Sequence, residues 1–242
     1  MVWRTTSPRS LVPSAFCRHR VDDMSPALEQ LWPPFGLLVE CGPLTLSPVR
    51  DSDFPELVAL AHEGIHDADA MPFGFPWTLG TPDEVRMRLL QFHWGLRAAM
   101  TPASWQLETT VRFEGEVVGC QGISTNDYLV TRTGETGSWL GAKHHGRGIG
   151  TLMRQALTAF MFDHLDAVEV TSAAFSDNPA SLAVSRKVGY RENGLVRRRR
   201  REGEMALSQQ LSLTAETLNR SDQKLRVSGV MELREFLGLA PA

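Results

Sequence analysis

A glycine-rich turn between a predicted strand and a predicted helix constrains this chain more than any other feature. The strand covers residues 135–142, and the helix after the turn carries Leu152, Leu157 and Phe160 at helical spacing. The turn itself reads His145-Gly146-Arg147-Gly148-Ile149-Gly150. Glycines let backbone N–H groups approach a ligand closely, and a helix N-terminus carries partial positive charge. The turn therefore indicates a site for a phosphate or pyrophosphate.

Two common phosphate-binding motifs do not fit this turn. A P-loop requires Gly-x-x-x-x-Gly-Lys-Ser/Thr, and no lysine precedes Thr151. A dinucleotide fingerprint requires Gly-x-Gly-x-x-Gly, whereas the glycines here are spaced one residue too tightly. The acid at about the expected distance, Glu169, lies inside a predicted strand, 167–173, and not at its end. Both interpretations are disfavoured.

A capped helix follows that strand. Asn178 is placed to cap it, with Pro179 at the first helical position, and Gly189 in the pair Gly189-Tyr190 is a helix stop. The glycine turn and this Asn-x-x-Ser helix, in this order and spacing, resemble the GNAT superfamily of acyl-CoA-dependent N-acetyltransferases. The family signature is Gln/Arg-x-x-Gly-x-Gly/Ala, and this chain has His145 at the first position.

One branch of that superfamily resembles the chain most. An acid shortly before a Gly-aromatic-Trp-Leu strand is typical of the RimJ/RimL ribosomal-protein N-acetyltransferases, and Glu135-Thr-Gly-Ser-Trp139-Leu140 is similar to it. The resemblance covers about 44–214. It implies an α/β (α+β) fold with a central mixed, mostly antiparallel, splayed sheet flanked by helices. Residues 1–43 are then an N-terminal extension, partly disordered or with the true start near Met24, and 215–242 a C-terminal extension.

The remaining pattern predicts the order of the elements. A first strand is expected at 44–50, and Asp51 and Asp53 are N-cap candidates for the helix after it. Glu114-Gly115 indicates a hairpin turn. We expect the other elements to be a helix between residues 81 and 99, strands at 105–113 and 117–124, a loop at 127–134, a turn at 192–194, strands at 195–199, 205–213 and 225–227, and a helix at 231–237.

Composition agrees with a globular enzyme. The 242 residues are 42% hydrophobic with a net charge of −3, so no overall positive charge favours nucleic acid. Cys17, Cys41 and Cys120 are odd in number and lack motif spacing, which favours a reducing, cytoplasmic compartment. No apolar run approaches about 18 residues, so no membrane span is predicted. The arginine run at 197–201 is interpreted as a solvated hairpin beside two acids.

His62-Glu63-Gly64-Ile65-His66 is a competing motif. It matches the His-Glu-x-x-His zinc site of metallopeptidases. Gly64 weakens the helix that this site requires by about 1 kcal/mol. No third histidine follows at metzincin spacing, and Glu84 is the only later ligand of a suitable kind. We therefore expect no metal, although the zinc metallopeptidase stays as an alternative.

The resemblance implies roles for the residues of the donor site. Backbone amides of the turn would hold the pyrophosphate, and the end of the preceding strand would pair with the pantetheine arm. The Leu140 N–H would stabilise the developing oxyanion, a donor worth about 3–4 kcal/mol in a dry site. The cofactor-binding residues expected on this basis are Trp139, Leu140, Gly141, Ala142, His145, Gly146, Arg147, Gly148, Ile149, Gly150, Thr151, Asn178, Ser181, Ser185 and Arg186.

The acceptor amine must lose a proton, because a lysine-like amine has a pKa of about 10.4. The resemblance makes Glu135 the candidate base, with Asp127 in reserve on the acceptor side. Many family members protonate the leaving thiolate with a tyrosine four residues before the Gly-Phe/Tyr pair. This chain has Ser185 there, which becomes the candidate acid. Residues after the first helix are expected to line the acceptor pocket: His66, Asp67, Phe73, Phe75 and Trp77.

The sequence thus predicts an N-acyltransferase that acts by direct attack of a primary amine on an acyl-CoA. Acetyl-CoA is the default donor, and a larger one such as succinyl-CoA stays open. The acceptor is a small-molecule amine, a protein N-terminus or a lysine, and the strands and the C-terminal extension are compatible with a homodimer. A non-catalytic acyl-CoA-binding regulator is the other alternative, because the usual tyrosine is absent.

Overall fold

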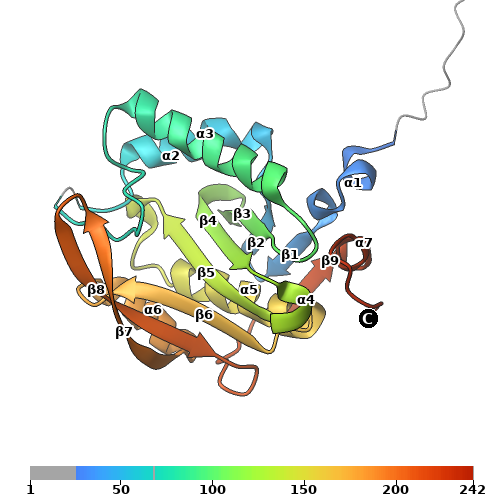
Figure 1. Cartoon of the computed structure of the whole chain (residues 1–242). Helices are drawn as coiled ribbons and strands as arrows, with labels where there is room; N and C mark the ends of the chain where they lie inside the picture. The colour runs from blue at the N-terminus through green and yellow to red at the C-terminus, as the bar shows by residue number, and fades with distance from the viewer. Residues whose placement is uncertain (1–25, 68, 242) are drawn as a thin grey trace, which may run out of the picture.

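A computed structural model describes residues 26–67 and 69–241 (Figure 1). The lead expected at residues 1–23 therefore lies outside the described residues. Within them, the core is one sheet in the order β7-β8-β6-β5-β4-β3-β2-β1-β9. Its strands are β1 (Leu38–Cys41), β2 (Leu44–Pro48), β3 (Gln106–Phe113), β4 (Glu116–Thr125), β5 (Thr133–Leu140), β6 (Glu169–Phe175), β7 (Arg191–Arg201), β8 (Glu204–Leu213) and β9 (Leu225–Ser228).

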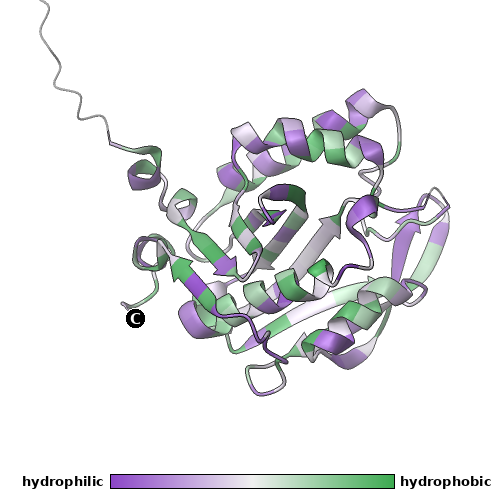
Figure 2. Cartoon of the chain, turned by 180° about the vertical axis from the view of Figure 1, so that it is seen from behind, coloured by the Kyte–Doolittle hydropathy of each residue, from purple (hydrophilic) through white to green (hydrophobic). Residues whose placement is uncertain are grey.

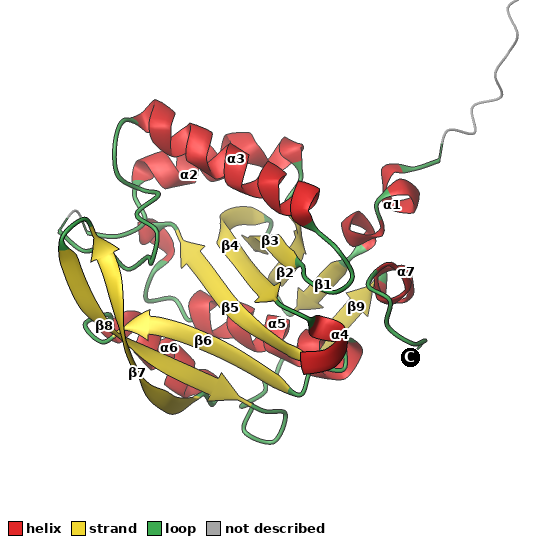
Figure 3. Ribbon diagram, in the orientation of Figure 1, coloured by secondary structure: helices red, strands yellow, loops and turns green. Residues whose placement is uncertain are grey.

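Helices cover both faces of this sheet (Figure 3). Helices α2 and α3 lie over one face, and α5 and α6 lie over the other, which Figure 2 shows from behind, coloured by hydropathy. The helices are α1 (Leu28–Leu31), α2 (Phe54–Glu63), α3 (Pro82–Ala99), α4 (Tyr128–Thr131), α5 (Ile149–His164), α6 (Pro179–Val188) and α7 (Val230–Phe236), with short 3₁₀ turns at Pro33–Gly36, Asp51–Asp53 and Ala142–His144.

Two strands in the middle of the sheet are parallel and diverge. β5 pairs with β6 only from Thr133 opposite Glu169 to Thr136 opposite Ser172, whereas the other neighbouring strands pair antiparallel. β5 then continues to Leu140 along β4, and β6 continues to Phe175 along β8. The expected mixed, mostly antiparallel and splayed sheet is confirmed.

The alternation of side chains along β5 separates two environments. Leu140 packs in the large core with α5. Trp139 packs against the smaller cluster, which contains Leu57 of α2 and Cys120 of β4. Because side chains in a strand alternate between faces, Thr136 and Ser138 share the α5 face and Glu135 shares the α2 face.

Local signals explain why the helices start where they do. Thr81 caps α3 in a capping box with Glu84, and Asn178 caps α6 by accepting the N–H of Ser181 at 3.1 Å. Asp53 occupies the N-cap position of α2, and its carboxylate forms an ion pair with Arg112 of β3 at 2.6 Å. Gly189 ends α6 at φ 106°.

Several expected elements differ from the structure. The strand at residues 44–50 is not the first, because β1 precedes it and pairs with both β2 and β9. The loop at 127–134 contains the short helix α4. The prediction of a turn at 192–194 is wrong, because these residues lie inside β7, where the register against β8 shifts between Glu192 and Leu195. Gly194 at φ 96° makes an irregularity there and not a chain reversal.

Candidate active site

The glycine turn takes a backbone conformation that other residues rarely adopt. Gly146 has φ 74° and Gly148, the N-cap of α5, has φ 80°. A Cβ built on either glycine would meet no atom within 4 Å, so the turn faces open space. The glycines are therefore required by the backbone and leave its amides accessible.

The start of α5 offers unpaired amides. Thr151 and Leu152 donate their N–H groups to the Gly148 carbonyl at 3.1 Å. Within the described part of the chain, the N–H groups of residues 146–150 make no hydrogen bond, and the first turn of α5 has no acidic residue. Amides and helix dipole together form an anion site suited to a pyrophosphate.

The splay between β5 and β6 leads toward this turn. The Gly141 N–H donates to the Val118 carbonyl at 3.0 Å, and Leu140 lies opposite Gly119 of β4. Bonded and non-bonded pairs alternate along an antiparallel ladder, so the N–H groups of Ser138 and Leu140 point away from β4, toward the β6 side. Since β6 has already diverged, these amides have no strand partner there among the described residues, and an extended ligand arm can pair with them.

His145 occupies the first signature position and serves the strand end. Its Nε2 lies 3.1 Å from the Leu140 carbonyl, so the ring fixes the strand where the turn begins. Arg147 turns away from the glycines: its guanidinium lies over the Phe113 ring at 5.5 Å and 3.3 Å from Nδ1 of His144. Ala142 and Thr151 lie at the two ends of the turn, as expected.

Helix α6 contributes the opposite wall. Ser185 is fully buried, accepts from Arg154 Nη1 at 2.7 Å and donates to the Ser181 carbonyl at 3.0 Å. Arg186 is exposed on the outer side of the helix. Sequence reasoning missed Arg154, which lies on the buried face of α5, because only apolar positions were used to define that face.

Four aromatic residues join the expected acceptor segment to β5. Ring centroids of His66 and Phe73 are 5.7 Å apart, those of Phe73 and Trp77 are 5.6 Å apart, and those of Trp77 and Trp139 are 5.6 Å apart. The loop between α2 and α3 is thereby packed on the end of β5. Phe75 and Asp67 are exposed on this loop, away from the packed rings.

The two acids proposed as bases lie on different elements. Glu135 is exposed on the α2 face, next to Thr136, the last residue of β5 that pairs with β6. Asp127 precedes α4, before β5 begins, at the end of the strand opposite to the glycine turn. Of the two acids, only Glu135 therefore lies on the strand that leads into the turn.

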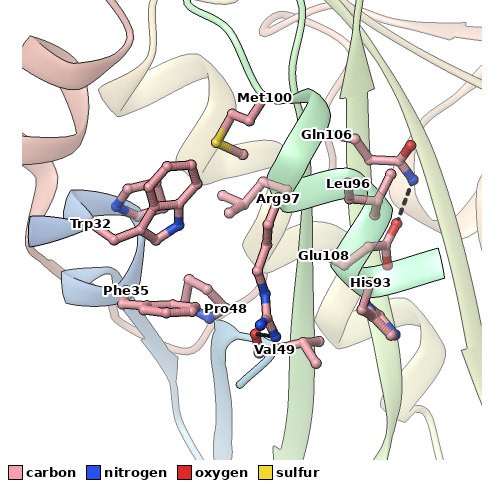
Figure 4. A pocket seen from close by; sticks show the side chains of 12 residues that line it. Trp32, Phe35, Pro48, Val49, His93, Leu96, Arg97, Met100, Gln106 and Glu108 are labelled. Atoms are coloured by element: carbon pink, nitrogen blue, oxygen red, sulfur yellow. Dashed lines mark hydrogen bonds between the residues drawn. The ribbon is translucent and has the colours of Figure 1, made fainter. Parts of the chain in front are cut away.

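Glu108 of β3 is a further acid on the α2 face that sequence reasoning missed. It lies opposite Gly122, whose missing side chain makes room for the Glu108 carboxyl, and Gly122 lies opposite Gly137, over which the face is open. Gln106 donates to its carboxyl at 2.8 Å, and both line a cavity with His93 and Arg97 (Figure 4). Burial raises the pKa of Glu108 to about 7 and lowers that of His93 to about 4.

The zinc motif does not form its site. Helix α2 ends at Glu63, and Gly64 has φ 115°, so His62 and His66 do not share one helix. Nε2 of His62 lies 2.9 Å from the Pro82 carbonyl, and Nε2 of His66 lies 2.9 Å from Thr78 Oγ1. Over 26–67 and 69–241, no group of three His, Cys, Asp or Glu side chains is placed to hold a metal ion. The same residues include no helix long and apolar enough to cross a bilayer.

The diverging parallel strands lead into a glycine-rich helix start, an arrangement suited to an elongated ligand with a phosphate at one end. A family model described as an acetyltransferase (GNAT) domain matches residues 43–191. The chain belongs to this GNAT acetyltransferase family.

Individual relatives agree with that assignment. RimJ of Mycobacterium smegmatis, in complex with CoA-disulfide, superposes with a TM-score of 0.63 at 23% identity, over 78% of this chain and 91% of that one. A GNAT-family acetyltransferase of Bacillus anthracis gives 0.59 at 17% identity, over 74% and 99%. "Putative ribosomal N-acetyltransferase YdaF" of Bacillus subtilis (strain 168) is 29% identical over 91 residues, 38% of this chain and about half (49%) of that protein.

Proposed function

We propose that this protein is an N-acyltransferase that moves an acetyl group from acetyl-CoA to a primary amine by direct attack. The observation that carries the proposal is the opening between β5 and β6 beyond Thr136, which continues into the unpaired amides at the start of α5. An elongated donor with a pyrophosphate at one end and a thioester at the other matches both parts of this path.

The donor's parts are assigned to specific groups. The N–H groups of residues 146–150 would bind the pyrophosphate, with Thr151 at the edge of the same turn. The strand end Trp139–Ala142 would pair with the pantetheine arm, and Asn178 and Ser181 would face it from α6. Arg186 is assigned to the adenosine phosphate, because its exposed guanidinium lies on α6 in the last turn.

The chemistry requires three groups beside the thioester. The Leu140 N–H, which points to the open side of β5, would donate to the carbonyl oxygen as negative charge develops on it. Glu135 would accept the proton of the attacking amine, directly or through a water. Ser185 is held by Arg154 and by the Ser181 carbonyl, so it would face the donor mainly as a small residue that permits close approach.

The acceptor would approach over the α2 face. The packed rings of His66, Phe73, Trp77 and Trp139 form a wall beside β5 there, and exposed Phe75 and Asp67 extend it. RimJ and RimL, the latter described as a ribosomal L7/L12 alpha-N-protein acetyltransferase in complex with coenzyme A, share the fold. On that basis we favour a protein N-terminus over a small amine. The homodimer expected from the sequence stays a proposal that sedimentation velocity tests.

Native mass spectrometry of the purified protein, titrated with acetyl-CoA, succinyl-CoA and free CoA, tests the donor site. We expect acetyl-CoA and CoA to bind the wild type. We expect neither to bind the Gly148→Glu variant, because this substitution places a side chain and a negative charge at the anion site. Failure of all three to bind the wild type would refute the proposal. Transfer with succinyl-CoA across an amine and peptide panel decides whether the larger donor is used.

A non-catalytic acyl-CoA-binding regulator is the second candidate. The observation in its favour is that Ser185 replaces the usual tyrosine and is fully buried. Tight binding of acetyl-CoA without transfer to any peptide or amine of the panel would favour the regulator over the enzyme.

A further inference from the structure

Arg154 is a buried guanidinium without a carboxylate. The residue is 5% exposed, and among the described residues no Asp or Glu oxygen lies within 4.0 Å of it. Its two hydrogen bonds go to serine hydroxyls: Nη1 donates to Ser185 Oγ at 2.7 Å and Nη2 to Ser138 Oγ at 3.1 Å. Its Nε is buried and has no partner in the described part of the chain.

A second buried arginine, Arg234, differs from Arg154 because it has a carboxylate partner. Arg234 is 3% exposed, but it pairs with the Asp166 carboxylate at 2.9 Å and donates to the carbonyl of His164 at 2.6 Å. A buried charge without a counter-charge costs folding free energy, and it persists where another anion compensates it. Burial lowers the pKa of Arg154, yet an arginine keeps its charge at any pH that the protein experiences. Arg154 therefore presents a cation to whatever enters between β5 and α6.

Ser138 is the contact between this cation and the open strand end. It lies on β5 beyond Thr136, where β6 has diverged, and its side chain is partly exposed. The Ser138 oxygen accepts from Arg154, while its own proton has no acceptor in the described structure. The proton of Ser185, in contrast, is used by the Ser181 carbonyl. Ser138 is thus the hydroxyl that can still donate, and the guanidinium makes it a stronger donor.

We propose that Ser138 is a catalytic residue that donates a hydrogen bond to the leaving sulfur of the acyl donor, and that Arg154 positions and polarises it. This inference rests on the proposed N-acyltransferase function. In the step concerned, the amine nitrogen forms a bond to the acyl carbon and the C–S bond breaks. The electron pair of that bond remains on sulfur as a thiolate, and the amine proton passes to the base. The Ser138 hydroxyl and the Arg154 charge stabilise that thiolate without giving up a proton.

Other titratable groups near this position are few. Tyr190, which follows α6, lies 3.0 Å from Thr136 Oγ1, and burial raises its pKa to about 12, so it stays neutral. His145 lies at the end of β5 against the Leu140 carbonyl, and Glu135 lies on the other face of the strand. None of them contacts the hydroxyls of Ser138 and Ser185.

Binding of CoA and of desulfo-CoA, compared by calorimetry from pH 6 to pH 9, tests the inference without an acceptor. Both carry the same phosphates, so their affinity ratio reports the sulfur alone. A free alkyl thiol ionises near pH 8.5, as cysteine does. We expect the wild type to favour CoA over desulfo-CoA by about tenfold more at pH 9 than at pH 6, since a hydrogen bond to a charged group has this strength. Ser138→Ala and Arg154→Gln should lose that increase.

Ser47→Ala is the matched control, because Ser47 of β2 also accepts from an arginine, Arg112, at 3.3 Å, far from the opening. It should keep the wild-type ratio at every pH. A CoA preference that does not rise with pH, or that rises equally in Ser138→Ala, would overturn the inference. An equal loss of affinity for both ligands in Arg154→Gln would also overturn it, because Arg154 would then bind the pantetheine arm and not the sulfur. If neither ligand binds the wild type, the proposed function fails as well, so the two failures are distinguishable.

Discussion

Glu135 is the residue on which amine activation is predicted to depend. It lies on the α2 face of β5, beside the last pair with β6, where an amine that crosses this face would reach the thioester. We expect Glu135→Gln to lower kcat/KM by about 10²–10⁴, because general-base assistance has this size. Acetyl-CoA affinity should be unchanged. Acetylated product on the best peptide acceptor, measured by mass spectrometry, gives the rate.

Asp127→Asn is the matched control for that measurement. Asp127 is also exposed, but it precedes α4 and lies outside β5. The substitution should leave kcat/KM within about twofold of wild type, as surface changes away from a site usually do. If Asp127→Asn loses activity and Glu135→Gln keeps it, then Asp127 and not Glu135 is the base.

Glu108 predicts a pH-dependent contribution to stability. Burial raises its folded-state pKa to about 7 from the ordinary value 4.5, so the folded state binds this proton more tightly than the unfolded chain. The contribution is fully present below pH 4.5 and is lost as the pH rises through about 7. We expect Glu108→Gln to raise the free energy of unfolding at pH 8 by about 1–3 kcal/mol, and to change it little at pH 4.

Urea unfolding of both proteins from pH 4 to pH 8, followed by tryptophan fluorescence, measures that difference. His93, which lines the same cavity, has the opposite sign: its lowered pKa costs stability as the pH falls below 6.5 toward about 4. It affects both proteins alike and cancels in the comparison. A difference between wild type and Glu108→Gln that is constant over the whole pH range would contradict the prediction.

At the scale of elements, the start of α5 depends on its glycine conformation. Gly148→Ala keeps the chain at φ 80°, where a side chain is strained, so we expect a loss of about 1 kcal/mol of stability and weaker CoA binding. Gly95→Ala, at an exposed position within α3, is the control. It should stabilise the protein by up to about 1 kcal/mol through helix propensity and leave binding unchanged. Equal effects of the two substitutions on CoA affinity would exclude this role of the turn.

Local signals predicted most of the elements. The hairpin at Glu114-Gly115, the cap at Asn178 and the glycine turn each depend on neighbours in sequence, and the structure has all of them. The turn expected at 192–194 failed because Gly194 serves equally well in a bulge, and long-range pairing with β8 decides between the two. Likewise, β1 is short, and its place in the sheet depends on β9, almost 190 residues further along the chain.

The site shows the same division. The amides of the turn follow from the local glycine pattern, whereas Arg154 and Glu108 gain meaning only from tertiary contacts. Arg154 resembles an ordinary polar residue in a helical pattern until Ser138 of β5 and Ser185 of α6 converge on it. Glu108 resembles a strand surface residue until α3 covers it. Burial of a charged group cannot be deduced from the residues beside it in sequence.

At the scale of the whole molecule, the two ends of the described chain complete the sheet together. β9 pairs with β1 from Leu38 opposite Ser228 to Cys41 opposite Leu225, and α7 packs on the same core. Arg234 of α7 ties this segment to the end of α5 through the His164 carbonyl and Asp166. The residues expected as a C-terminal extension are therefore structurally continuous with the sheet that holds the site.

Substitution of Leu237 tests how much stability the packing of the C-terminal segment on the core contributes. Leu237 is 1% exposed in the core that also holds α5, so Leu237→Ala should lower the free energy of unfolding by about 2–5 kcal/mol through lost contacts and a cavity. Leu31→Ala is the matched control, since Leu31 is 64% exposed and should cost less than about 0.5 kcal/mol. Urea midpoints of both variants decide the matter. If Leu237→Ala costs no more than Leu31→Ala, then the C-terminal segment does not contribute to the cooperative core, and the sheet must be stable without β9.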